Sequence, residues 1–183
     1  MMERWCNGCD GWAKDEIELE NKKCLGCGEY VTHSYTYFTI VSGGELGKYG
    51  HEASAAGAFD PDEIRKLLEI EPFNSCKKGD YRENIPKGEP QEKYDFSKWS
   101  GEKSEIERYD IPQQCLDTIR RLKYKIPELL EIKSHYDVKF YLRIVPNIYN
   151  AESPIMYFDK EIIEFCYLTG TEIDVDTYVY ENE

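Results

Sequence analysis

Two Cys-x-x-Cys pairs near the start of the chain could bind a metal ion. The first pair is Cys6 and Cys9, and the second is Cys24 and Cys27. Four thiolates in this arrangement match the tetrahedral coordination of zinc, with Zn–S distances of about 2.3 Å. A glycine precedes the second cysteine of each pair, where it tolerates the tight backbone turn that such a site needs. Because four cysteines leave no open coordination position, the spacing predicts one structural zinc ion rather than a catalytic one.

The predicted zinc site divides the chain into a zinc-ribbon-like module at 1–34 and a larger domain at 35–183. A segment of about 30 residues buries too little apolar surface to fold alone, so zinc would supply its folding free energy. The seven cysteines of the chain are an odd number, which argues against a framework of disulfides. The first residues lack the apolar run of a secretory signal, and no stretch of about 18 apolar residues predicts a membrane span. We therefore expect a cytoplasmic protein.

The charge of the chain indicates which class of partner it can bind. Its formal net charge is −13, and residues 144–183 contain nine acidic residues against one basic residue. Nucleic-acid binding depends on Lys and Arg side chains that neutralise phosphates, so this composition argues against it. An acidic surface instead attracts a basic protein through long-range electrostatics. The charge therefore favours a basic protein partner.

The end of the chain is the candidate binding surface for that partner. Alternation along 172–180 predicts a strand whose outer face is acidic and rich in tyrosine, a residue that is common at protein interfaces. The outer face consists of Glu172, Asp174, Asp176, Tyr178 and Tyr180. The inner, core-facing side consists of Ile173, Val175, Thr177 and Val179. The leading hypothesis is therefore a non-enzymatic, acidic protein-binding module.

Two other functions stay open at this point. One is an enzyme whose site lies near the loops 42–58 and 77–80, built from Lys77, Lys78 and Asp80 with His51 nearby. No phosphate-binding loop or nucleophile-elbow motif supports a particular reaction. The other is a zinc ribbon that binds nucleic acid, although acidic residues outnumber basic ones in 1–34.

The periodicity of apolar residues predicts the elements that must position these groups. We expect helices that begin at Asp60, Asp110 and Asp159. Near Pro127, the second should either kink or divide into two nearly collinear helices. Cys115 and Cys166 fall on apolar helix stripes and should be core residues. Strands are expected at 35–41, 94–99, 138–145, 155–158 and 173–179. The order β-α-β-α-β-β-α-β predicts an α+β fold with helices packed on one face of a largely antiparallel sheet.

The larger domain resembles the DUF4279 family of bacterial proteins. The resemblance rests on short motifs at 59–64, 70–72, 78–80 and 96–99 and on the segment 153–180. It covers about residues 35–180 and leaves out the cysteine module. The family implies no established activity. Its members look like the small acidic α+β proteins found beside bacterial toxins, which implies an immunity or antitoxin-type protein.

Overall fold

The fold is organised around a five-stranded sheet. The computed structural model describes residues 5–6, 11–12, 34–42, 58–82, 90–104, 110–149 and 154–180. In spatial order, the strands of the sheet are β4 (Asn74–Cys76), β5 (Ser97–Ser100), β3 (Tyr35–Ser42), β6 (Lys139–Val145) and β8 (Thr171–Val175). Neighbouring strands are antiparallel except β6 and β8, which are parallel. The central strands β3 and β6 lie side by side over most of their length, so they hold the sheet together.

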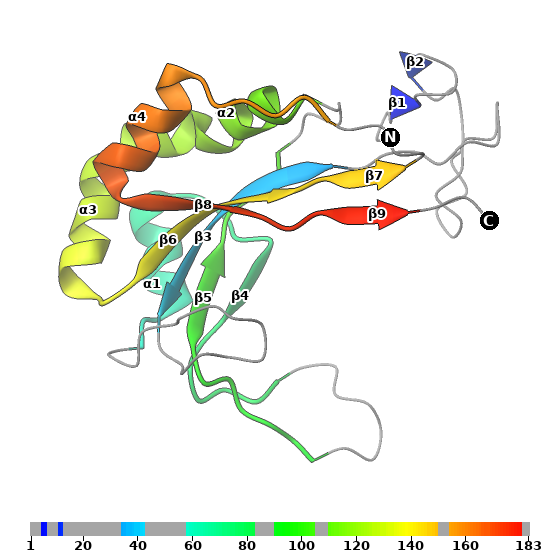
Figure 1. Ribbon diagram of the computed structural model, residues 1–183. Helices are drawn as coiled ribbons and strands as arrows, with labels where there is room; N and C mark the ends of the chain where they lie inside the picture. The colour runs from blue at the N-terminus through cyan, green and yellow to red at the C-terminus, as the bar shows by residue number, and fades with distance from the viewer. Residues whose placement is uncertain are drawn as a thin grey trace.

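The helices of the described residues pack on one face of this sheet (Figure 1). They are α1 (Pro61–Leu68), α2 (Ile111–Leu122), α3 (Ile126–His135) and α4 (Lys160–Thr169). The arrangement confirms the predicted α+β class, with helices on a mostly antiparallel sheet. No helix in these ranges has the length and apolar character needed to cross a membrane.

An aspartate caps the start of α1, α2 and α4, as predicted. The carboxylate of Asp60 accepts a hydrogen bond from the backbone N–H of Asp62 at 3.0 Å. Asp110 and Asp159 accept equivalent bonds at 3.1 Å from Gln113 and Ile162. Each bond satisfies an N–H group that the first helical turn leaves without a partner. These local signals explain why the helix starts can be found in the sequence.

The predicted interruption near Pro127 is present, and it divides the segment into two helices. One 3-10 turn, η1 (Lys123–Lys125), separates α2 from α3. Pro127 has no N–H, and its ring would clash with the carbonyl four residues earlier in a regular α-helix. Ile119, Leu122 and Leu129 are nonetheless buried in one core on either side of the turn. The apolar stripe therefore continues through the 3-10 turn.

The core lies between the helices and the inner face of the sheet. Phe38, Phe140 and Trp99 are among its largest fully buried side chains. Cys115 and Cys166 are also buried, as predicted. Burial raises the pKa of Cys115 to about 12 and that of Cys166 to about 11. Both thiols are therefore protonated and act as small apolar groups.

The structure corrects two predictions near the end of the chain. Residues 155–158 form no strand, and Ile155 makes only an isolated bridge with Asp110. The predicted last strand is divided into β8 and β9 (Tyr178–Tyr180), and β9 pairs in parallel with β7 (Asn147–Tyr149). The predicted inner face of this last strand is not buried: Ile173, Val175 and Val179 are 37%, 41% and 62% exposed. β8 is an edge strand, so these side chains have the side chains of a neighbouring strand, β6, on one side only.

Candidate functional site

The face of the sheet opposite the helices carries aromatic and charged side chains. Side chains alternate along a strand, so the neighbours of the buried Phe38, Phe140 and Leu142 point to this opposite face. We call it the tyrosine face and define it by Tyr35 and Tyr37 of β3, Tyr141 and Arg143 of β6, and Glu172 and Asp174 of β8. Two of its members, Glu172 and Asp174, are among the five residues predicted to bind a partner.

Arg143 lies near the middle of the tyrosine face. Its guanidinium forms an ion pair with the carboxylate of Asp174, which lies directly opposite on β8. Its Cζ atom is also 4.9 Å from the centre of the Tyr141 ring. Burial raises the pKa of Tyr37, and the nearby Arg143 acts in the opposite direction. Arg143 therefore interacts with Tyr37, with Tyr141 and with Asp174, which is one of the residues predicted to bind a partner.

A second ion pair occupies the same two strands. Lys139 Nζ is 3.8 Å from the Glu172 carboxylate. Glu172 and Asp174 are thus each paired with a basic residue of β6. The predicted acidic strand is therefore less negative at these positions than the sequence indicates.

Asp176 and Tyr178 extend the tyrosine face beyond β8. The Tyr178 hydroxyl donates a hydrogen bond to the Asp176 carboxylate at 2.9 Å. Their backbone N–H groups donate to Ile144 and Pro146, both at 2.9 Å, which holds the segment beside the end of β6. Tyr180 pairs through its backbone in β9, and its side chain lies outside the described residues. Asp176 also contributes to the raised pKa of Tyr37, although less than burial does.

An aromatic cluster lies at the β3 side of this face, and sequence reasoning missed it. The Tyr35 and Tyr37 rings stack with centres 6.0 Å apart, and the Tyr37 and Phe73 rings are perpendicular, with centres 5.1 Å apart. Lys103 Nζ is 3.8 Å from the centre of the Tyr35 ring and 5.0 Å from that of Phe73. The Tyr-x-Tyr spacing in the predicted strand could have indicated the first two rings. Phe73 and Lys103 come from other segments, and no sequence signal connects them.

Lys98 and Cys76 are half-buried on the same side of the sheet, directly opposite each other on β5 and β4. Burial lowers the pKa of Lys98 and raises that of Cys76, and each group partly offsets the shift of the other. Cys76 Sγ lies 3.9 Å from the carbonyl oxygen of Phe96. Of the three described free cysteines, Cys76 is the one that solvent reaches most readily.

The residues of the enzyme alternative form an exposed turn. Lys77 Nζ pairs with the Asp60 carboxylate at 2.8 Å, and this hydrogen bond is the main reason that the pKa of Asp60 is lowered. The Asp80 N–H donates to the Lys77 carbonyl at 3.1 Å across Gly79, which has a φ of +92°. His51 lies outside the described residues. In the described part of the chain, these groups support the turn and do not converge on a shared site.

The predicted zinc ligands mostly fall outside the described residues. This holds for Cys9, Cys24 and Cys27, and only the backbone of Cys6 is described. Cys6 belongs to β1 (Trp5–Cys6), which pairs antiparallel with β2 (Gly11–Trp12) and places Cys6 opposite Gly11. Within the described ranges, no group of three or more His, Cys, Asp or Glu residues could hold a metal ion.

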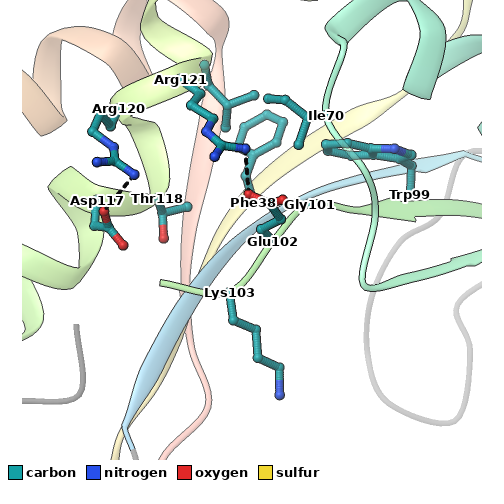
Figure 2. Close-up of a pocket in the computed structure, with 11 residues that line it drawn as sticks. Phe38, Ile70, Trp99, Gly101, Glu102, Lys103, Asp117, Thr118, Arg120 and Arg121 are labelled. Atoms are coloured by element: carbon teal, nitrogen blue, oxygen red, sulfur yellow. Dashed lines mark hydrogen bonds and ion pairs between the residues drawn. The ribbon is translucent and has the colours of Figure 1, made fainter. Parts of the chain in front are cut away.

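A small pocket lies on the helical side of the sheet, between α2 and the segment after β5 (Figure 2). Its volume is about 30 Å³, and Phe38, Ile70 and Trp99 supply its apolar walls. An ion pair between Glu102 and Arg121, at 2.7 Å, lies at its rim. Ligand sites usually measure about 300–1,000 Å³, so this cavity has room for little more than a water molecule.

Comparison with known proteins leads to one family. No curated protein and no solved structure matches the chain. Residues 32–180 of the 183 match DUF4279, a domain of unknown function. The matched segment contains every strand and helix of the five-stranded sheet and its covering layer. The chain therefore belongs to the DUF4279 family.

Proposed function

We propose that this protein is a non-enzymatic binding module for a basic protein, of the kind that immunity and antitoxin proteins represent. The partner would contact the tyrosine face, together with Asp176 and Tyr178, but not Tyr141, which is only 6% exposed. The observation that carries this proposal is that aromatic rings and a carboxylate of this region already contact two basic side chains of the same protein. Arg143 contacts Tyr141 and Asp174, and Lys103 contacts Tyr35 and Phe73.

The chemistry of these contacts suits a basic partner. Aromatic rings attract Lys and Arg through their negative faces, and carboxylates add charge and hydrogen bonds. Tyrosine also buries a rigid ring at low entropic cost, which makes it effective at interfaces. The Asp176 carboxylate accepts a hydrogen bond from the neutral Tyr178 hydroxyl and forms no ion pair within the described part of the chain, so its negative charge is retained for a partner.

The test is a kinetic comparison of two variants, made on the proteins that copurify with the chain from its native host. Asp176→Asn should slow association, because it removes long-range attraction. Tyr178→Ala should speed dissociation about fivefold or more, as expected for the loss of about 1 kcal/mol of buried contact. Salt should slow association by the wild-type protein, since the screening length falls from about 10 Å at 0.1 M to about 3 Å at 1 M.

Matched controls lie on α4, on the helical side of the sheet. Glu164→Gln and Tyr167→Ala remove the same chemical groups from exposed positions there. Both should leave the rates unchanged. The proposal fails if the face variants and the α4 variants behave alike, or if the captured proteins are acidic.

We also propose that Cys6, Cys9, Cys24 and Cys27 hold one structural zinc ion. The support is their spacing, together with the paired segments β1 and β2, which flank residues 7–10. β1 contains Cys6, and β2 begins two residues after Cys9. An antiparallel pair at these positions brings the chain back on itself, as a metal-binding turn requires.

Thiol labelling with and without a chelator tests the zinc site. In the native protein, the half-buried Cys76 should react slowly with iodoacetamide, because its pKa is also raised, while deeper burial protects Cys115 and Cys166. Bound zinc should protect the other four thiols, and a chelator should expose those four together. Metal analysis should give about one zinc ion per chain, as four-thiolate sites bind. Absence of metal, with the four thiols reactive before chelation, would refute the site.

A further inference from the structure

We infer that the Tyr35 and Phe73 rings form a seat for a lysine side chain of the partner, and that Lys103 occupies this seat in the free protein. This inference rests on the proposed function, and it names the chemical group that one part of the tyrosine face would recognise. The seat is a cation-binding site made of aromatic rings rather than of carboxylates.

The geometry is that of an ammonium group shared between two rings. Lys103 Nζ lies 3.8 Å from the centre of the Tyr35 ring and 5.0 Å from the centre of the Phe73 ring. Both distances fall within the limit of about 6 Å for a cation–π contact. Tyr37 touches both rings and fixes their relative position. In the described residues no carboxylate pairs with Lys103, so the rings alone hold its charge.

Backbone hydrogen bonds hold both the seat and the segment that carries its occupant. Tyr35 is fixed by its place in β3, and the Phe73 N–H donates to the Ser100 carbonyl at 3.0 Å. The backbone around Lys103 is also held, because Gly101 and Ser104 donate to carbonyls of β3 at 2.9 and 2.8 Å. Figure 2 shows the Lys103 side chain extending away from the other residues that line the pocket. Only the lysine side chain must rotate to empty the seat.

The contact with Lys103 is weak enough for a partner to displace it. An exposed cation–π contact favours the closed form by a factor of about 2 to 5. Competition of this size lowers the affinity of the seat for an incoming ammonium group by a factor of about 3 to 6, because only the open fraction of the protein can bind it. Removing Lys103 should therefore increase the affinity of the seat by the same factor.

The test uses n-butylammonium, which copies the end of a lysine side chain, and 1-butanol as its neutral counterpart. Binding is followed by saturation-transfer NMR at constant ionic strength. Lys103→Ala should bind n-butylammonium about 3- to 6-fold more tightly than the wild type, with no gain for 1-butanol. Adding Phe73→Ala should remove the gain without changing the charge. Phe73 is exposed, so its truncation should not unfold the domain.

Lys93→Ala is a control for charge, because Lys93 lies over the single ring of Tyr81 at 4.9 Å. It should produce a smaller gain than Lys103→Ala. The seat is refuted if the two gains are equal, or if the gain from Lys103→Ala survives Phe73→Ala. These measurements need no partner protein. A negative result here, combined with partner rates that depend on Asp176 and Tyr178, would overturn the seat and leave the proposed function standing.

Discussion

Replacing Trp99 with alanine should reduce the free energy of unfolding by about 3–5 kcal/mol, the range for truncating a large aromatic residue in a core. Trp99 is fully buried and is the largest side chain in the core. A Cβ atom built on Gly101 would lie 2.9 Å from the Trp99 ring, which shows how closely the chain packs around it. Small domains are stable by only about 5–15 kcal/mol, so this loss would bring the protein near its unfolding threshold.

Trp99→Phe provides an internal comparison. The Trp99 indole N–H has no hydrogen-bond partner among the described residues. Phenylalanine keeps much of the apolar volume and removes this unsatisfied donor, so it should cost far less than alanine. Urea denaturation followed by circular dichroism measures both. Tyr124→Ala, at an exposed position, should stay within about 0.5 kcal/mol of the wild type. A loss below about 1 kcal/mol for Trp99→Ala would contradict the close packing around the indole ring.

Features that depend on neighbouring residues could be predicted from the sequence. The caps at Asp60, Asp110 and Asp159 each act within three residues of the helix start. The buried stripes of the helices and the alternation of 138–145 are also local patterns, and they determine the layers of the fold. This is why the α+β class follows from the order and periodicity of the residues alone.

Features that depend on pairing between distant segments could not be predicted. Nothing in the alternation of Ile173 and Val175 shows that β8 lies at the edge of the sheet, where the predicted inner face stays exposed. The polar strand β4 carries no strand signal and forms because it pairs with β5. The seat likewise combines Tyr35, Phe73 and Lys103 from three separate segments. The acidic residues of β8 are evident in the sequence, but their ion pairs with β6 depend on the sheet register.

Arg143→Met should destabilise the protein by about 1–3 kcal/mol, because it leaves the Asp174 carboxylate without its cation. The Arg143 and Asp174 side chains are 14% and 28% exposed, so water compensates only in part. A double-mutant cycle with Asp174→Asn isolates the interaction, and its coupling energy should be at least about 0.5 kcal/mol. The Lys139 and Glu172 pair is the matched control on the same strands. The Lys139 and Glu172 side chains are more exposed, at 36% and 59%. Exposed pairs contribute about 0–1 kcal/mol, and the coupling energy of this pair should lie near the lower end of that range, below that of Arg143 and Asp174.

Arg143→Met should weaken the fold but strengthen the attraction of a basic partner. Arg143→Met restores the full negative charge of Asp174 to the tyrosine face, so a basic partner should associate faster even though the domain is less stable. Asp174→Asn with Arg143→Met should cancel that gain, because neither charge remains. Stopped-flow association at low salt, below the unfolding temperature of each variant, measures the effect. If Arg143→Met slows association and the double variant does not restore it, then Arg143 contacts the partner directly, and the tyrosine face does not select for basic groups at this position.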